Sequence, residues 1–209
     1  MEEDNNKEAK INNGLSPQAG VEEKKIGKRG IKSFLPFVWE IIQIVVIALV
    51  IVLPIRYFLF QPFIVRGESM VPNLKSGDYL IVDEISYRFT EPQRGNIIVF
   101  KYPKDTAQRF IKRIIGLPGE TVEIKEGKIT IYKNNSFALN EEYLPDDLKT
   151  EGDINIVLGP DEYFVLGDNR EYSFDSRRWG ILSKEYIIGK AYLRIFPITT
   201  LSQIETPIY

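Results

Sequence analysis

A long apolar segment near the N-terminus constrains the fold of this chain more than any other feature. Between Trp39 and Phe60 the central stretch Ile44–Ile55 carries no charged residue. A helix rises about 1.5 Å per residue, so a helix from Trp39 to Phe60 would be roughly 33 Å long, which matches a hydrocarbon core of about 30 Å. We therefore predict one transmembrane helix over residues 34–60 and name the lipid bilayer as the first partner.

A buried core helix and a cleaved signal peptide are the alternatives for this segment. The rest of a 209-residue chain is too small to surround so apolar a helix. A signal peptide would have a shorter apolar region, about 7–15 residues, followed by a cleavage site of small residues. Here the chain continues Phe60-Gln-Pro-Phe-Ile-Val-Arg66 instead. The membrane span remains the preferred interpretation.

The residues that flank the span predict its orientation. Residues 1–33 are polar and almost free of aromatic side chains, which predicts a disordered tail. Only Arg56 and Arg66 lie close to the C-terminal side of the span. Five basic residues lie close to its N-terminal side: Lys24, Lys25, Lys28, Arg29 and Lys32. The positive-inside rule therefore places the tail in the cytoplasm and residues 61–209 outside it as one domain.

Residues 61–209 carry mainly strand signals. Short runs rich in β-branched and aromatic residues, separated by Gly and Pro turns, occupy residues 78–82, 97–100, 109–115, 122–124, 128–132, 163–166 and 187–196. Seven or more short strands predict an all-β barrel or sandwich of antiparallel strands. Residues 122–132 are predicted to form a hairpin that turns at Glu126 and Gly127.

The composition limits the chemistry that this domain can perform. The chain contains neither His nor Cys, which excludes Ser-His-Asp and Cys-His catalysis, disulfides, and zinc or haem sites built from these residues. We predict no cofactor and no metal. With 27 basic and 29 acidic residues the net charge is -2, so nothing favours binding to nucleic acid. A serine nucleophile here would need a lysine as its base.

One predicted strand offers such a lysine. In Arg109–Ile115 the alternation of side chains places Lys112 on one face with Phe110, and Arg113 on the other. Arginine cannot be deprotonated, so only Lys112 can act as a base. At an ordinary pKa near 10.4, about one lysine in 2,500 is neutral at pH 7, so the site must lower that pKa. The alternative is an edge strand whose lysine opposes aggregation.

Two polar segments could complete a site. Ser69 lies in the segment Gly67-Glu-Ser-Met-Val-Pro-Asn-Leu74. The alternative is a structural role, because a serine in a Gly- and Pro-containing turn usually forms a hydrogen bond with its own backbone. The second segment, Gly167–Gly180, is a dense polar loop after an apolar strand, and its alternative is a local turn with an internal Asp–Arg pair.

Taken in order, these segments resemble the type I signal peptidases, the membrane-bound Ser-Lys endopeptidases that remove signal peptides from exported preproteins. The resemblance covers the span and most of residues 57–200. It rests on five boxes: Ser69–Leu74, Gly77–Val82, Arg94–Phe100, Lys112–Gly119, and Gly167–Arg170 running to Ser173, Asp175 and Arg177. It implies a compact single-span member of the bacterial cytoplasmic membrane, with a short hairpin insert over residues 121–166.

The resemblance also implies the roles of individual residues. Ser69 would be the nucleophile and Lys112 the general base. Ser173 would supply a hydroxyl that positions the lysine amine. Asp175 and Arg177 would form a structural pair, and Arg113 would support the fold. Cleavage would follow small residues at positions −1 and −3, because shallow apolar pockets reject larger ones. By motif position those pockets would be lined by Phe63, Val65, Met70, Leu74, Phe110 and Ile111, although each could equally be a core residue.

Some positions depart from the family pattern. Asn73 stands where Thr is common, Asn96 where an acidic residue is common, and Glu120 where Asp is common. Gly67 occupies a position where some members carry a Ser whose hydroxyl helps to bind the oxyanion. The oxyanion hole would therefore depend on the Ser69 backbone N–H and a second donor that the sequence does not identify.

Other functions compete with this hypothesis. A membrane-tethered β domain that binds a partner without catalysis would explain the span and the strands, but it would not need Ser69 and Lys112 together. A self-cleaving Ser-Lys protease related to phage-type repressors would need a soluble DNA-binding head in place of the span. A catalytically dead homologue is disfavoured by the intact Ser-Lys pair. The sequence does not indicate the oligomeric state.

Overall fold

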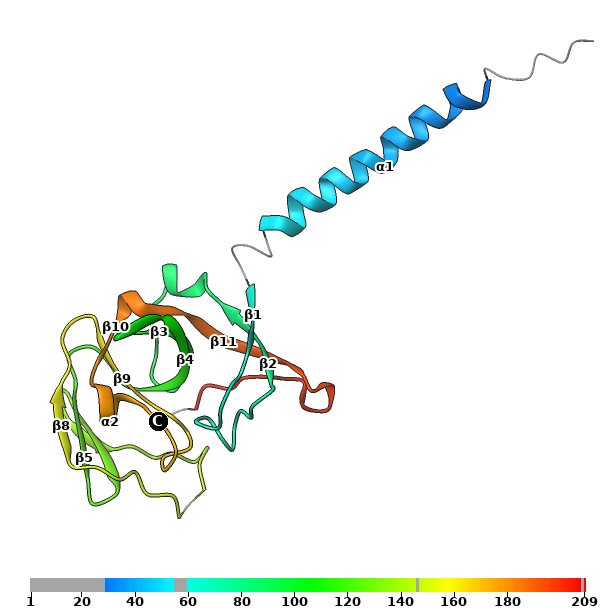
Figure 1. The fold of residues 1–209 in the computed structure, drawn as a ribbon. Helices are drawn as coiled ribbons and strands as arrows, with labels where there is room; N and C mark the ends of the chain where they lie inside the picture. Colours follow the sequence, from blue (N-terminus) through cyan, green and yellow to red (C-terminus); the bar gives the residue numbers. More distant parts are fainter. Residues whose placement is uncertain (1–28, 55–59, 146, 208) are drawn as a thin grey trace, which may run out of the picture. The chain divides into compact units, whose positions relative to one another are not determined.

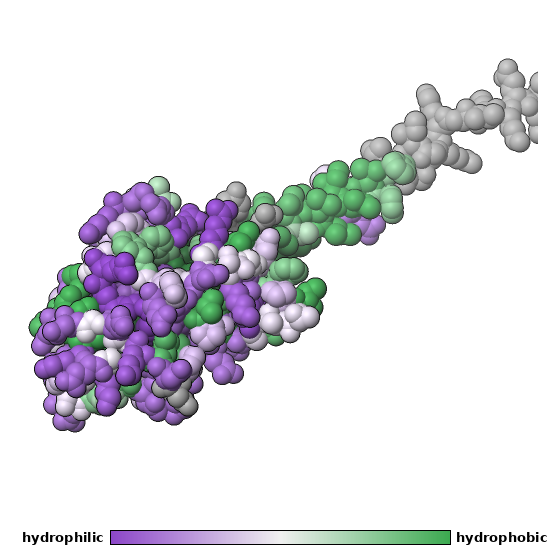
Figure 2. Space-filling view, turned by 60° about the horizontal axis from the view of Figure 1, so that its bottom comes forward, coloured by the Kyte–Doolittle hydropathy of each residue, from purple (hydrophilic) through white to green (hydrophobic). Residues whose placement is uncertain are grey.

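The computed structural model describes residues 29–54, 60–145, 147–207 and 209. Helix α1 (Arg29–Pro54) contains the apolar segment Pro36–Leu53, none of which is buried. Within the described residues it is the one helix that is long and apolar enough to cross a bilayer. In Figure 2 most of its surface is hydrophobic, as lipid contact would require.

The predicted boundaries of the N-terminal segments change in part. Residues 1–28 of the predicted tail and residues 55–59 of the predicted span lie outside the described residues. Helix α1 begins at Arg29, five residues before the predicted start of the span. Phe60 is not the last residue of a helix, because it pairs with Asp83 as the first residue of strand β1.

The described residues from Phe60 onward form two antiparallel sheets (Figure 1), which confirms the all-β prediction. The larger sheet has the order β1 (Phe60–Ile64), β2 (Tyr79–Asp83), β11 (Ile187–Phe196), β3 (Ile97–Tyr102), β4 (Asp105–Gly116), β9 (Glu162–Leu166) and β10 (Leu182–Ser183), with β12 (Ser202–Gln203) paired to β11. The smaller sheet has the order β7 (Ser136–Ala138), β6 (Lys128–Tyr132), β5 (Thr121–Lys125) and β8 (Ile154–Val157). The short helical elements are η2 (Ser86–Arg88), α2 (Ser176–Trp179), η3 (Lys184–Tyr186) and η4 (Ile198–Thr200).

The smaller sheet contains the predicted hairpin. Strands β5 and β6 pair throughout, and the turn between them has φ of 54° at Glu126 and 80° at Gly127. Positive φ at both central residues is the geometry that matches the twist of a two-residue hairpin. The predicted insert over residues 121–166 is too long, however, because β9 at its end is buried and pairs with β4 and β10 in the larger sheet.

The larger sheet curls so that strands far apart in its order share one core. Strands β1 and β4 are separated by β2, β11 and β3. Even so, Val65 after β1 and Ile111 of β4 belong to the same buried cluster, together with Leu80 and Val99. This curl brings the turn after β1 close to the middle of β4.

Candidate active site

The turn that follows β1 presents Ser69. Met70 and Leu74 are fully buried in the core of the curled sheet and anchor the turn there. The Leu74 N–H donates to the Met70 carbonyl at 2.8 Å, and the Val71 N–H donates to the Glu68 carbonyl at 3.2 Å. Ser69, directly before Met70, stays half-buried.

Lys112 reaches Ser69 from the middle of β4. Its Nζ donates to Ser69 Oγ at 2.7 Å and to the carbonyl of Ile111 at 2.8 Å. The side chain is almost wholly buried; β4 pairs with β3 at Lys112 and with β9 from Arg113 onward. The interpretation of this lysine as a solvent-facing charge that opposes aggregation is therefore wrong, because its amine is buried against Ser69.

Burial changes the protonation of Lys112. Desolvation lowers its pKa from 10.5 to about 8, although the charges of Asp175 and Asp168 act in the opposite direction. A buried ammonium loses its hydration, which disfavours the charged form. Near pH 8 about half of the molecules therefore carry a neutral amine within hydrogen-bonding distance of the Ser69 hydroxyl.

An ion pair between Asp175 and Arg177 holds the loop after β9 together. Asp175 Oδ2 accepts from the Gly167 N–H at 3.1 Å and from Arg177 Nη2 at 2.9 Å. Its Oδ1 caps helix α2 by accepting from the Arg177 N–H at 3.2 Å. Arg177 Nη2 also donates to the Arg170 carbonyl at 2.7 Å.

Ser173 is buried within this loop, and within the described residues its hydroxyl has no hydrogen-bond partner. A Cβ placed on Gly167 would overlap both Ser173 Oγ and the Ser69 carbonyl oxygen. Both atoms therefore lie beside the Cα of Gly167, and only glycine fits at this position.

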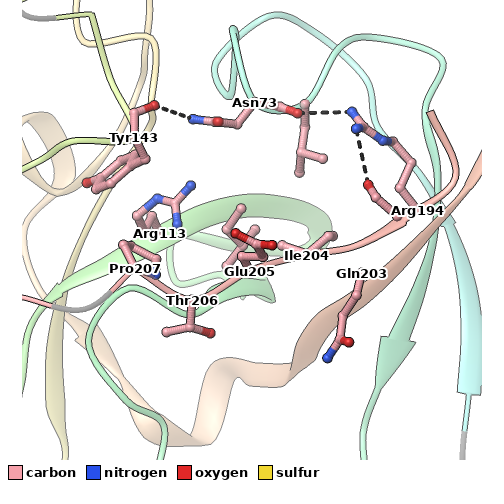
Figure 3. Close-up of a pocket in the computed structure, with 12 residues that line it drawn as sticks. Asn73, Arg113, Tyr143, Arg194, Gln203, Ile204, Glu205, Thr206 and Pro207 are labelled. Atoms are coloured by element: carbon pink, nitrogen blue, oxygen red, sulfur yellow. Dashed lines mark hydrogen bonds between the residues drawn. The ribbon is translucent and has the colours of Figure 1, made fainter.

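Arg113 faces away from Lys112 and forms a buried ion pair with Asp168. Its Nε and Nη2 donate to the two carboxylate oxygens at 2.8 and 2.7 Å, and its Nη1 donates to the Gly95 carbonyl at 2.9 Å. Asn73 Nδ2 also donates to Asp168, at 2.9 Å, and to the Tyr143 carbonyl at 3.2 Å (Figure 3). Asp168 thereby joins the Ser69 turn to the strand of Lys112, a link that sequence reasoning did not foresee.

A cleft of about 820 Å³ opens in front of Ser69 and Lys112. Of the predicted pocket residues, Phe63, Phe110 and Ile111 line it. Val65, Met70 and Leu74 do not: each is buried inside the curled sheet, where it packs against the core. Two exposed aromatic residues that the prediction omitted, Tyr172 and Phe174, also line the cleft.

A second cavity, of about 260 Å³, lies elsewhere on the domain. Asn73, Arg113, Arg194 and the segment Ser202–Pro207 line it, as Figure 3 shows, and neither Ser69 nor Lys112 contributes to it. In the described part of the chain no group of three or more acidic side chains could hold a metal ion. The absence of a metal or cofactor stays a prediction.

Comparisons with known proteins identify the family of this chain. The family model described as "Signal peptidase, peptidase S26" matches residues 38–196. The chain is 40% identical over 176 residues to a probable signal peptidase I-1 of Synechocystis sp., covering 80% of this chain and 87% of that one. It is 38% identical over 167 residues to a signal peptidase I P of Bacillus subtilis subsp. natto, covering 75% and 88%.

A crystal structure of a signal peptidase I from Enterococcus faecalis is 33% identical to this chain and covers 48% of it and 97% of that chain, with a TM-score of 0.42. The sequence relatives and the family model extend over most of the chain. The chain therefore belongs to the signal peptidase family, peptidase S26, and is a serine endopeptidase.

Proposed function

We propose that this chain cleaves signal peptides from exported preproteins with Ser69 as nucleophile and Lys112 as general base. The 2.7 Å separation between Ser69 Oγ and Lys112 Nζ carries the proposal. The pKa of Lys112, lowered to about 8 by burial, supplies the neutral amine that a base requires. The adjoining cleft is large enough for a stretch of extended peptide.

The acylation step follows from these contacts. A neutral Lys112 amine can keep one N–H on the Ile111 carbonyl while its lone pair accepts the Ser69 proton. Ser69 Oγ then bonds to the carbonyl carbon at the end of the signal peptide. As the C–N bond breaks, Lys112 returns the proton to the leaving amine, which becomes the N-terminus of the mature protein.

Deacylation reuses the same base. Water gives a proton to Lys112 and attacks the ester carbonyl that links the signal peptide to Ser69. The ester bond breaks, Ser69 Oγ recovers its proton from Lys112, and the signal peptide leaves as a carboxylic acid that gives its proton to the solvent. Each cycle restores the neutral lysine.

The surrounding residues have supporting roles in this proposal. The family resemblance assigns Ser173 to position the lysine amine; its hydroxyl is buried and, among the described residues, makes no hydrogen bond to Lys112 or to any other group, so it is free to make one. Asp175 and Arg177 keep the loop of Ser173 closed through their ion pair at 2.9 Å. Arg113 supports the fold through its pair with Asp168 and takes no part in proton transfer.

Small residues at positions −1 and −3 are the proposed specificity. Phe63, Phe110 and Ile111 form apolar walls close to Ser69, and a larger substrate side chain would overlap them. The substrates in this proposal are preproteins with an Ala-x-Ala type of cleavage site.

Helix α1 is the proposed anchor in the bacterial cytoplasmic membrane, with the N-terminus in the cytoplasm and residues 61–209 outside. Its apolar length and the basic residues before it support this orientation. A tethered enzyme meets a substrate already in the bilayer at a high effective concentration. Because the chain has no Cys, single-cysteine variants test the orientation: a membrane-impermeant thiol reagent should label Ser136→Cys in intact spheroplasts and leave Ser16→Cys unlabelled.

The proposed function is tested by incubating the full chain in detergent with a preprotein bearing an Ala-x-Ala site. Wild type should cut after the second Ala, as the masses of the products will report, and Ser69→Ala and Lys112→Ala should be inactive. Ser136→Ala and Lys125→Ala make the same changes at exposed positions of the smaller sheet and should cleave as wild type does. Cleavage by either site variant would show that Ser69 and Lys112 are not the nucleophile and base, and an inert wild type would favour the tethered binding domain.

A further inference from the structure

The peptide bond between Glu68 and Ser69 has a special place in the proposed reaction. Its N–H belongs to Ser69 and is the backbone donor expected to face the oxyanion. Within the described residues this N–H donates to no protein acceptor. A trans peptide is planar, and its C=O and N–H point in opposite directions, so whatever holds the Glu68 carbonyl also aims the Ser69 N–H. Gly67 has no side-chain hydroxyl to share this task.

Asn169 holds this peptide from the loop after β9. Its side-chain Nδ2 donates to the Glu68 carbonyl at 3.1 Å, and its backbone N–H donates to the Ser69 carbonyl at 3.0 Å. One residue thus holds two successive carbonyls of the nucleophile turn. Asn169 Oδ1 accepts from the Tyr172 N–H at 3.3 Å, which fixes the amide so that Nδ2 faces Glu68.

We propose that Asn169 is a positioning residue for the oxyanion hole: its side-chain amide fixes the Glu68–Ser69 peptide so that the Ser69 N–H points at the developing negative charge. This inference rests on the proposed Ser69–Lys112 function and adds a residue to which that function gave no role. Asn169 does not line the cleft and makes no hydrogen bond with Lys112. Its effect is therefore on the transition state, with little on substrate binding or on the base.

The size of the effect follows from the geometry. Removing an oxyanion donor outright costs about 10²–10³-fold in kcat. Loss of the Asn169 amide leaves the Ser69 N–H in place but less well aimed. The loss is only partial, because the Val71 N–H still donates to the Glu68 carbonyl. We expect kcat to fall about 10- to 100-fold, KM to change less than about threefold, and the acid limb of the pH profile to stay in place.

The test compares Asn169→Asp and Asn169→Ala in the full chain. The aspartate has the shape of asparagine and can still accept from the Tyr172 N–H, but it presents an oxygen instead of a donor to the Glu68 carbonyl. Asn140→Asp is the matched control, because Asn140 Nδ2 donates to Glu142 at an exposed site away from the cleft. Ser69→Ala is measured in the same assay to monitor the proposed function itself.

Binding of a peptide aldehyde ending in Ala-x-Ala separates positioning from a general loss of structure. Ser69 Oγ adds to the aldehyde carbon, and the resulting oxyanion needs the same N–H as the reaction does. The inhibition constant of the aldehyde should therefore rise by about the same factor as kcat/KM falls, and Asn140→Asp should match wild type. Unlike kcat, this constant does not depend on the fraction of enzyme that is active.

Three results would count against the inference in different ways. If Asn169→Asp and Asn169→Ala both cleave within about twofold of wild type while Ser69→Ala is inactive, the positioning role fails and the proposed function stands. If the variants lose kcat but bind the aldehyde as wild type does, Asn169 has only a structural role. If Ser69→Ala also cleaves, the proposed function itself has failed.

Discussion

The rate of cleavage should follow the loss of a proton from Lys112. Its pKa is lowered from 10.5 to about 8, chiefly by burial. At pH 7 a lysine with a pKa of 8 is neutral in about one molecule in eleven, compared with about one in three thousand at a pKa of 10.5. The fold thus raises the reactive fraction by roughly 300-fold. Because the neutral amine is the base, activity must increase with pH.

The assay is kcat/KM for a peptide that spans an Ala-x-Ala site and has no titratable side chains, measured from pH 6 to 10. We expect a rise of about tenfold per pH unit below pH 7, a midpoint near pH 8 and a plateau above pH 9. A flat profile between pH 6 and 9 would refute the role of Lys112 as base. A rate that still climbs at pH 10 would refute the argument from burial.

Three further predictions concern stability and packing. Lys112→Met should abolish cleavage and, by removing a buried amine whose pKa burial lowers to about 8, raise the free energy of unfolding by up to about 3 kcal/mol at pH 7. Denaturant titrations should show this gain shrinking as pH rises from 8 to 10.5, since the folded wild-type lysine is then neutral; a gain that is constant with pH would contradict it. Asp168→Asn breaks the buried pair with Arg113 and should lower the free energy of unfolding by about 3–5 kcal/mol in the same titrations, so a loss below about 1 kcal/mol would show that the pair is not a strong support. Gly167→Ala should reduce kcat more than tenfold, because its Cβ would overlap Ser173 and the Ser69 carbonyl; wild-type kinetics would mean that the loop shifts without cost.

Local patterns in the sequence were sufficient for much of the fold. Alternation in residues 109–115 correctly located the strand of Lys112, and Glu126-Gly127 correctly located the hairpin turn. These features depend on neighbours in the chain, which the sequence displays directly. The predicted end of the insert was wrong, because β9 belongs to the larger sheet through its pairing with β4 and β10. Pairing between strands that are distant in the chain produces no local sequence pattern.

The candidate site was predictable where a motif names a residue and less so where packing decides. The motifs single out Ser69 and Lys112, 43 positions apart, and Ser69 Oγ lies 2.7 Å from Lys112 Nζ; their catalytic roles stay a prediction. Val65, Met70 and Leu74 flank the nucleophile in sequence, but the curl of the sheet turns their side chains into the core. The contact of Asn169 with Glu68 joins residues 101 positions apart through a backbone carbonyl, which no residue pattern marks.

Replacing Ser69 by Cys tests the assignment of the nucleophile most directly. The chain has no native Cys, so Ser69→Cys introduces a single thiol, at the position where Lys112 lies at hydrogen-bonding distance. The account predicts that this variant retains measurable cleavage of an Ala-x-Ala preprotein and loses it when one alkyl group is added, whereas alkylated Ser136→Cys and treated wild type remain active. Cleavage that persists in fully alkylated Ser69→Cys would contradict the account, because no free nucleophile would remain at that position.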